Sequence, residues 1–163
     1  MEHIDMRKEE GRKITPIGIY IALLGIVTVA FGMADILVWA GLRPGIQVGI
    51  LEIAGDDFFR WAWGGFIMVC AGLFMLAGCT RVATLQQSAK VVLGGVLVWL
   101  IGGTDIFARL CVAIPAGEAS PAFFNSLSGF LGTFAPPYTP AMLLLPFTLG
   151  IVYLIRMHGT DDS

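Results

Sequence analysis

Two aspartates stand inside apolar stretches of this sequence, where a carboxylate is costly. Asp35 lies in FGMADIL (residues 31–37) and Asp105 lies in IGGTDIF (residues 101–107), each three residues after a glycine. Ionisable side chains within membrane-spanning segments face the protein interior, where they form ion pairs or handle protons and ions. These two carboxyl groups are therefore the first candidates for a functional site.

Two arginines are placed to pair with these aspartates. Arg109 follows Asp105 by four residues, the favourable acid-first spacing on a helix. No basic residue precedes Asp35 within its own apolar run, so either Arg60 from the next run is its partner or Asp35 carries a proton. We expect a polar pocket of Asp35, Arg60, Asp105 and Arg109, rimmed by Trp39, Trp61 and Trp63. Two interpretations stay open: an ion-pair cluster that fixes helix register, or a binding or proton-handling site that opens outward.

The composition identifies the elements that must hold these residues. The chain has 56% hydrophobic and 13% charged residues, against about 25% charged residues in an average soluble domain. A helix needs about 20 apolar residues to cross the hydrocarbon layer. Four runs suit this length: 14–42, 58–79, 91–114 and 140–157. The sequence predicts an all-α polytopic membrane protein, a four-transmembrane-helix bundle over residues 14–159, with a cytoplasmic N-terminal segment (1–13) and a cytoplasmic tail (160–163).

The basic residues predict the orientation of the bundle, because lysine and arginine concentrate on the cytoplasmic side. Of the ten lysines and arginines, seven fall on one side of the predicted bundle: Arg7, Lys8, Arg12, Lys13, Arg81, Lys90 and Arg156. We therefore expect a multi-pass protein of the cell membrane with both termini cytoplasmic and with residues 43–57 and 115–139 outside. In the first external segment, the alternation of Ile46, Val48 and Ile50 indicates a short extended stretch.

The external segment 115–139 has the pattern of an amphipathic helix. Ser120 followed by Pro121 is a typical helix start. One helical face then collects the large apolar side chains Phe123, Phe124, Leu127, Phe130, Leu131 and Phe134. This pattern predicts either a helix that lies in the outer membrane interface or one that packs over the mouth of the bundle.

Glycines recur every seven residues within the predicted spans. Seven residues are close to two helical turns, so each series lines one stripe, and small residues let helices approach closely in lipid. We expect helix packing along three series: Gly18, Gly25 and Gly32; Gly65 and Gly72; Gly95 and Gly102.

The two aspartates also mark a candidate internal repeat. Residues 23–37 (LLGIVTVAFGMADIL) align without a gap on residues 93–107 (LGGVLVWLIGGTDIF), and Leu, Gly, Gly, Asp and Ile coincide. A tandem two-helix repeat would place both aspartates at equivalent positions, whereas the simple composition of membrane helices would also produce such matches.

The sequence argues against several kinds of chemistry. Both histidines, His3 and His158, stand at the ends of the chain, so no histidine is available to hold a haem between helices. The cysteines Cys70, Cys79 and Cys111 fall at different membrane levels and form no CxxC pair. No phosphate loop, metal-ligand motif or nucleophile elbow is present. We predict no cofactor, no metal and no nucleic-acid partner, and we favour a protein that is not an enzyme.

The second and third spans carry a resemblance to a known family. In GLFMLAGCTRVATLQQSAKVVLGGVLVWL, a Gly-Leu apolar run leads to a Gly-x-Thr-Arg turn and a small-residue span, with Gly72, Leu73, Gly78, Thr80, Arg81 and Ala83 in the matching places. This stretch resembles DoxX-like four-helix membrane proteins over about a fifth of the chain. The chain departs from that pattern at WAWGG and at Asp35. The resemblance implies an accessory subunit of a membrane oxidoreductase, such as a quinone-linked one.

The sequence thus predicts a non-catalytic integral membrane protein that acts as an accessory or assembly subunit. Its expected partners are membrane lipid and either other membrane subunits or further copies of itself. One alternative is a small transporter or a proton- or ion-handling protein that uses the Asp/Arg cluster. A second alternative is an oxidoreductase component that binds a quinone beneath the tryptophans.

Overall fold

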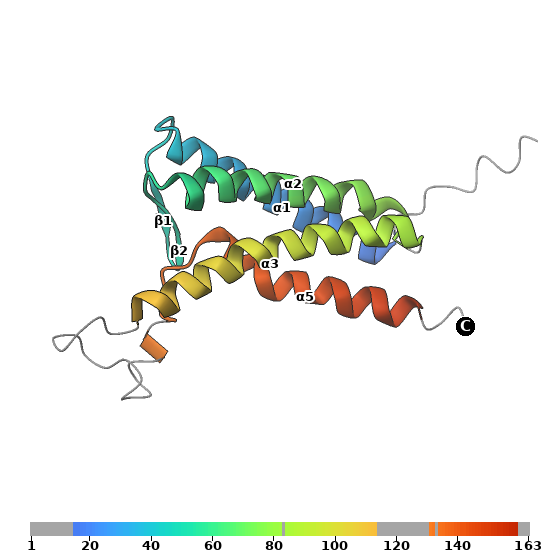
Figure 1. Ribbon diagram of the computed structural model, residues 1–163. Coiled ribbons are helices and arrows are strands. Elements are labelled where there is room, and N and C mark those ends of the chain that lie inside the picture. Colours follow the sequence, from blue (N-terminus) through green and yellow to red (C-terminus); the bar gives the residue numbers. More distant parts are fainter. Residues whose placement is uncertain (1–14, 83, 114–130, 133, 160–163) are drawn as a thin grey trace, which may run out of the picture.

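A computed structural model of the chain describes residues 15–82, 84–113, 131–132 and 134–159. The N-terminal segment 1–13, the tail 160–163 and most of the predicted loop helix within 115–139 lie outside the described residues. Within them, long helices dominate and run roughly alongside one another (Figure 1). Three are long and apolar enough to cross a membrane: Pro16–Trp39, Phe58–Gly78 and Leu85–Cys111.

The first helix, α1 (Pro16–Trp39), has clear start and stop signals. Thr15 caps its N-terminus by accepting a hydrogen bond from the Gly18 N–H, and Pro16 occupies the first turn. The helix ends before the apolar run does, because Gly41 adopts a φ of +69° that reverses the chain. The predicted first span, 14–42, is therefore a somewhat shorter helix.

A β-hairpin connects α1 to the next helix and adds a small β element to the predicted all-α fold. Strands β1 (Ile46–Val48) and β2 (Leu51–Ile53) pair antiparallel. Gly49 opens the two-residue turn between them with a φ of +58°, a conformation that favours glycine. Ile50, expected in the extended stretch, falls in this turn. β2 also bonds the segment before the last helix, since the Glu52 N–H donates to the Tyr138 carbonyl at 3.0 Å.

The second span is entered through a π-helical turn, η1 (Phe58–Trp63), and continues as α2 (Gly64–Gly78). The Asp57 carboxylate caps this entry by accepting a hydrogen bond from the Arg60 N–H at 2.9 Å. A short 3-10 turn, η2 (Cys79–Arg81), then leads into α3 (Leu85–Ala113). α3 begins before the predicted boundary at residue 91. Its helical backbone hydrogen bonds include the polar stretch LQQSAK, which lies outside the apolar run.

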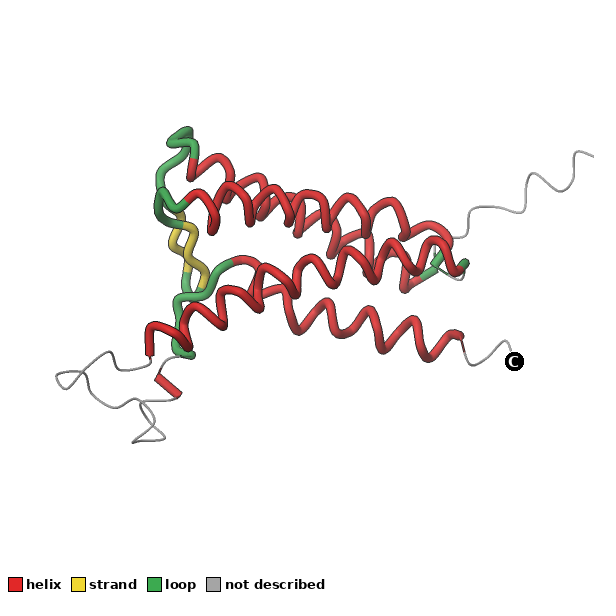
Figure 2. The backbone as a smooth tube through the Cα atoms, viewed as in Figure 1, coloured by secondary structure: helices red, strands yellow, loops and turns green. Residues whose placement is uncertain are grey.

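The last helix, α5 (Pro140–Gly159), packs against α3 and more lightly against α1 (Figure 1). The tube view shows two ends of the bundle (Figure 2). The hairpin and the start of α5 lie at one end, named here the hairpin end. The start of α1, the α2–α3 turn and the end of α5 lie at the other, named here the turn end.

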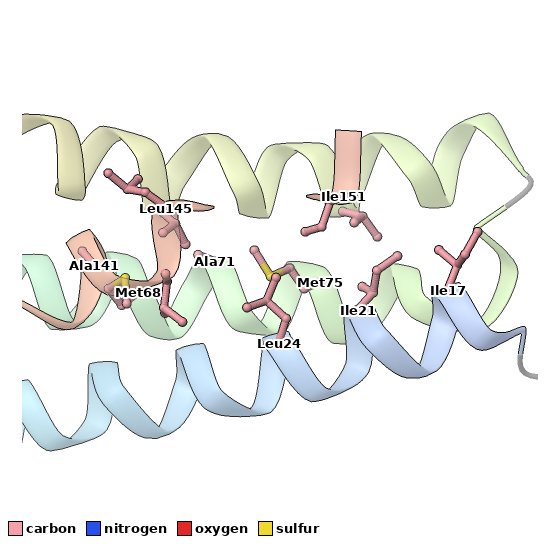
Figure 3. Packing of buried hydrophobic residues seen from close by; sticks show 12 residues of the cluster. Ile17, Ile21, Leu24, Met68, Ala71, Met75, Ala141, Leu145 and Ile151 are labelled. Carbon is pink, nitrogen blue, oxygen red and sulfur yellow. The ribbon is translucent and has the colours of Figure 1, made fainter. Parts of the chain in front are cut away.

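The interior between the helices is apolar. Ile21, Met68, Met75, Val91 and Val98 have no exposed surface. Figure 3 shows how side chains of α1, α2 and α5 meet along this core. The hydroxyls of two buried threonines donate within their own helices, Thr28 of α1 to the Leu24 carbonyl and Thr148 of α5 to the Leu145 carbonyl.

The predicted glycine stripes differ in how closely they meet a neighbour. A Cβ at Gly32 would stand 2.6 Å from the Gly65 carbonyl oxygen, and one at Gly72 would stand 2.6 Å from the Gly25 carbonyl oxygen. A Cβ at Gly102 would meet the Leu145 side chain at 2.9 Å, whereas one at Gly95 would reach only the Thr148 Cβ at 4.0 Å. Gly18 is buried in α1. Gly94, which the seven-residue spacing did not select, makes the close approach to the Ala71 carbonyl of α2.

Candidate functional site

Asp105 of α3 lies at the hairpin end, where two other elements reach its carboxylate. The Arg60 Nε of η1 stands 3.3 Å from the Asp105 Oδ1. The Thr139 hydroxyl, just before α5, donates to the Asp105 Oδ2 at 2.6 Å. Both carboxylate oxygens therefore have partners, and the side chain is held between the second span and the start of the last helix.

Asp35 of α1 occupies a different environment. It is 5% exposed, and its Oδ1 is buried without a hydrogen-bond partner among the described residues. The α2 residue next to Asp35 is Gly65, which has no side chain to offer. A Cβ at Gly65 would stand 3.0 Å from the Asp35 Cβ. The bonded polar group at this end consists, among the described residues, of Arg60, Asp105 and Thr139, and it is called here the Asp-Arg cluster.

Arg109 does not make the helical pair with Asp105 that the sequence spacing predicts. Its guanidinium donates to the Ala135 carbonyl at 3.0 Å and to the Pro137 carbonyl, and it lies over the Tyr138 ring with 5.6 Å between its Cζ and the ring centroid. The reason is competition: the segment before α5 presents carbonyls to Arg109, while Arg60 and Thr139 already occupy the Asp105 oxygens. Arg109 therefore anchors the entry to α5.

The three tryptophans do not form a common rim. Trp61 is 3% exposed and packs with Val38 and Ile53 beneath the hairpin, so it is a core residue of this end. Gly55, with a φ of +123°, lets the backbone pass close to the Trp61 indole nitrogen. Trp39 meets Phe58 edge-to-face and Trp63 stacks on Phe66, both on exposed surfaces. Arg60 lies over the Trp61 ring, 5.2 Å from its centroid.

Sequence reasoning missed two members of this region, Thr139 and Tyr138. Thr139 had a usable signal, because a threonine directly before a proline at a helix start is a typical cap. Its hydroxyl, however, bonds Asp105 of another helix. Tyr138 had no such signal, since its pairing with β2 joins segments far apart in the chain.

Within the part of the chain that the structure describes, no three His, Cys, Asp or Glu side chains gather as they would around a metal ion. The three cysteines are unpaired thiols, with Cys70 and Cys79 partly buried and Cys111 exposed. The buried carboxyl groups at the hairpin end are those of Asp35 and Asp105, and the Arg60 guanidinium and the Thr139 hydroxyl bond the second of them. A carboxyl group in a membrane-spanning segment can bind a positive charge or exchange a proton.

Comparison with protein-family models, curated proteins and solved structures gives no match for this chain.

Proposed function

We propose that the chain is a four-span integral membrane protein that acts as a non-catalytic accessory or assembly subunit of a membrane complex. Three helices have the length and apolar character of membrane spans. α5 is the proposed fourth span, because its 20 residues extend about 30 Å, the thickness of the hydrocarbon layer. Its first half, Pro140–Ile151, is apolar and packs along α3.

The observation that carries the subunit role is the apolar interior. From Met68 to Ile17, the core between the Asp-Arg cluster and the turn end consists of aliphatic, methionine and alanine side chains. The buried hydroxyls there bond to carbonyls of their own helices. Such a core suits a protein that presents lipid-embedded surfaces to partners better than one that moves ions or substrates through its centre.

The proposed orientation places the turn end in the cytoplasm. Lys90 lies near this end, on the first turns of α3, and basic residues favour the cytoplasmic side. The hairpin and the Asp-Arg cluster would then face outward. Single cysteines at Gly49 and Gly159, in a variant without Cys70, Cys79 and Cys111, test this. An impermeant thiol reagent added outside should modify Gly49→Cys alone, and modification of Gly159→Cys alone would reverse the topology.

The resemblance to DoxX-like proteins supports a membrane oxidoreductase as the class of complex. The stretch that carries it, 72–100, includes the close contacts of Gly72 with Gly25 and of Gly78 with the Gln87 carbonyl. The exposed tryptophans Trp39 and Trp63 at the hairpin end are typical of a membrane interface, and a quinone-linked partner would itself hold the quinone. Organic extraction of the purified complex should then recover a quinone, recognised by its redox-sensitive ultraviolet absorption.

Purification from native membranes in a mild detergent tests the subunit role. The expected result is a complex of defined mass that contains one other membrane protein at fixed stoichiometry. The isolated chain, solubilised after overexpression, is the control for self-association. Recovery from native membranes solely as a monomer or homo-oligomer would contradict the proposal.

A further inference from the structure

The β-hairpin lies across the hairpin end of the bundle, from the α1–α2 side toward the start of α5 (Figure 1, Figure 2). Ile46 of β1 and Leu51 of β2 are partly buried and pack against a cluster of Val38, Ile53 and Trp61. One face of the hairpin therefore rests on the helices. Its two edges point sideways, across the direction in which the helices run.

The two edges differ in what they bond. On β2, the Glu52 N–H donates to the Tyr138 carbonyl at 3.0 Å, and the Tyr138 N–H donates to the Ile50 carbonyl at 2.7 Å. Gln47 lies opposite Glu52 in the β1–β2 register, so the backbone groups of these two residues point away from each other. The Gln47 N–H and carbonyl therefore point outward from β1, and among the described residues they have no hydrogen-bond partner.

The free edge of β1 lacks the features that usually keep a strand edge from pairing. Its three residues, Ile46, Gln47 and Val48, include no charged residue and no proline, and their register with β2 contains no bulge. Val48 is 67% exposed. Such an edge is a template on which a further strand can add, as the segment at Tyr138 already does on β2.

We propose that the free edge of β1 pairs antiparallel with β1 of a second copy of this chain. The strand is complementary to itself. When Gln47 lies opposite the second copy's Gln47, the two residues exchange both of their hydrogen bonds, and Ile46 lies opposite the second copy's Val48.

The membrane provides the orientation that this pairing needs, which rests on the spanning arrangement proposed above. Two copies inserted in the same direction are related by an axis along the membrane normal. A two-fold axis in that direction converts a strand that lies across the bundle into an antiparallel strand, and it makes the contact the same on both copies. The hairpin lies in this way, with its free edge pointing sideways.

The strength of the contact follows from its size. An edge of three residues is far smaller than the roughly 800 Å² that each partner buries in a stable interface. The pairing therefore belongs to copies held in one membrane, where confinement raises their effective concentration. The dimer should dissociate when the protein is diluted in detergent.

Cysteine cross-linking in membranes of cells that express this chain alone tests the pairing, in a variant without Cys70, Cys79 and Cys111. Cα atoms of a hydrogen-bonded antiparallel pair lie about 5.5 Å apart, within the range of a disulfide. Oxidation of Gln47→Cys should therefore give a covalent dimer. Glu52→Cys, directly opposite on β2, is the matched control, because its two copies would lie roughly 14 Å apart, three strand spacings.

A dimer with Gln47→Cys and none with Glu52→Cys is the expected result. No dimer with Gln47→Cys, or equal dimer formation at both positions, as random collision would produce, overturns the proposal. Since no other subunit is present in these membranes, the outcome is separate from that of the purification that tests the subunit role.

A second measurement tests the backbone groups of the edge. Gln47→Pro removes the outward N–H without removing a bond to β2, whereas Gln47→Ala keeps this N–H. Energy transfer between labelled copies in the same membranes should show association weakened about tenfold by Gln47→Pro, which removes two hydrogen bonds from the pair, and little changed by Gln47→Ala. Equal association of the two variants would show that the copies do not meet through this edge.

Discussion

The α1–α2 pair and the α3–α5 pair use the same sequence pattern in different ways. In each, glycines seven residues apart on the first helix face the helix that follows, and an aspartate stands three residues after the second glycine. In α1–α2, glycine meets glycine, and backbones touch at Gly25 with Gly72 and at Gly32 with Gly65. In α3–α5, Gly102 receives the Leu145 side chain and Gly95 stands 4.0 Å from Thr148.

This difference shows that a glycine stripe does not by itself set how closely two helices approach. Backbone-to-backbone contact leaves no room for any side chain, so the geometry of α1–α2 is fixed. A glycine that receives a leucine side chain can adapt, because leucine has other rotamers. The first segment of the candidate repeat, 23–37, thus lies in the rigid α1–α2 pair. The second segment, 93–107, lies in the adjustable α3–α5 pair.

The same comparison explains the two aspartates. Asp35 faces the rigid pair, where close approach requires Gly65 and so excludes a polar partner from α2. Asp105 lies on α3 of the looser pair, where Thr139 before α5 reaches one of its oxygens and Arg60 of η1 reaches the other. Tight packing of α1 against α2 therefore leaves Asp35 without the partners that Asp105 has.

The largest expected effect is at the rigid pair. Gly32→Ala would place a Cβ 2.6 Å from the Gly65 carbonyl oxygen and 2.8 Å from the Val69 nitrogen, and neither backbone can yield. We expect the free energy of unfolding to fall by about 2–3 kcal/mol, measured by thermal unfolding in nanodiscs. Gly103→Ala is the control, because nothing lies within 4 Å of that position. Similar losses in both variants would end the distinction between the pairs.

An intermediate effect is expected when each of the two aspartates is replaced by asparagine. Asp105→Asn weakens the ion pair with Arg60, whose side chain is 44% exposed, so the loss should be about 1–2 kcal/mol. Asp35→Asn disturbs no hydrogen bond of the buried Oδ1 among the described residues, so stability should be unchanged or higher. Urea titration monitored by tryptophan fluorescence measures both. A greater loss for Asp35→Asn would show that the structure misses a partner of Asp35.

The smallest effects are expected in the adjustable pair. Gly102→Ala should cost about 0.5–1 kcal/mol, because the Leu145 side chain can move away. In a Leu145→Ala background the same change should cost almost nothing, which a double-mutant cycle would report as coupling between the two positions. Gly95→Ala should have no measurable effect. A cost at Gly95 equal to that at Gly102 would show that this pair is as tightly packed as α1–α2.

Several features of the chain follow from the sequence because they depend on local composition. Long apolar runs produce helices long enough to span a membrane, and three of the predicted spans correspond to such helices. Start and stop signals such as Thr15-Pro16 and Gly41 act on adjacent backbone, although the predicted run 14–42 extended past them. The alternation at Ile46 and Val48 likewise indicated the extended strand β1.

Other features were decided by tertiary structure, because each depends on which of several chemically suitable groups comes close in space. Spacing on one helix favoured Arg109 as the partner of Asp105, yet the π-helical turn η1 brings Arg60 to that carboxylate and the segment before α5 draws Arg109 to its carbonyls. The hairpin buries Trp61, although its position suggested a rim. The choice between Gly94 and Gly95 as the close contact with α2 is a matter of helix rotation. The sequence alone thus determined which residues were candidates, and only the packing of distant segments determined their partners.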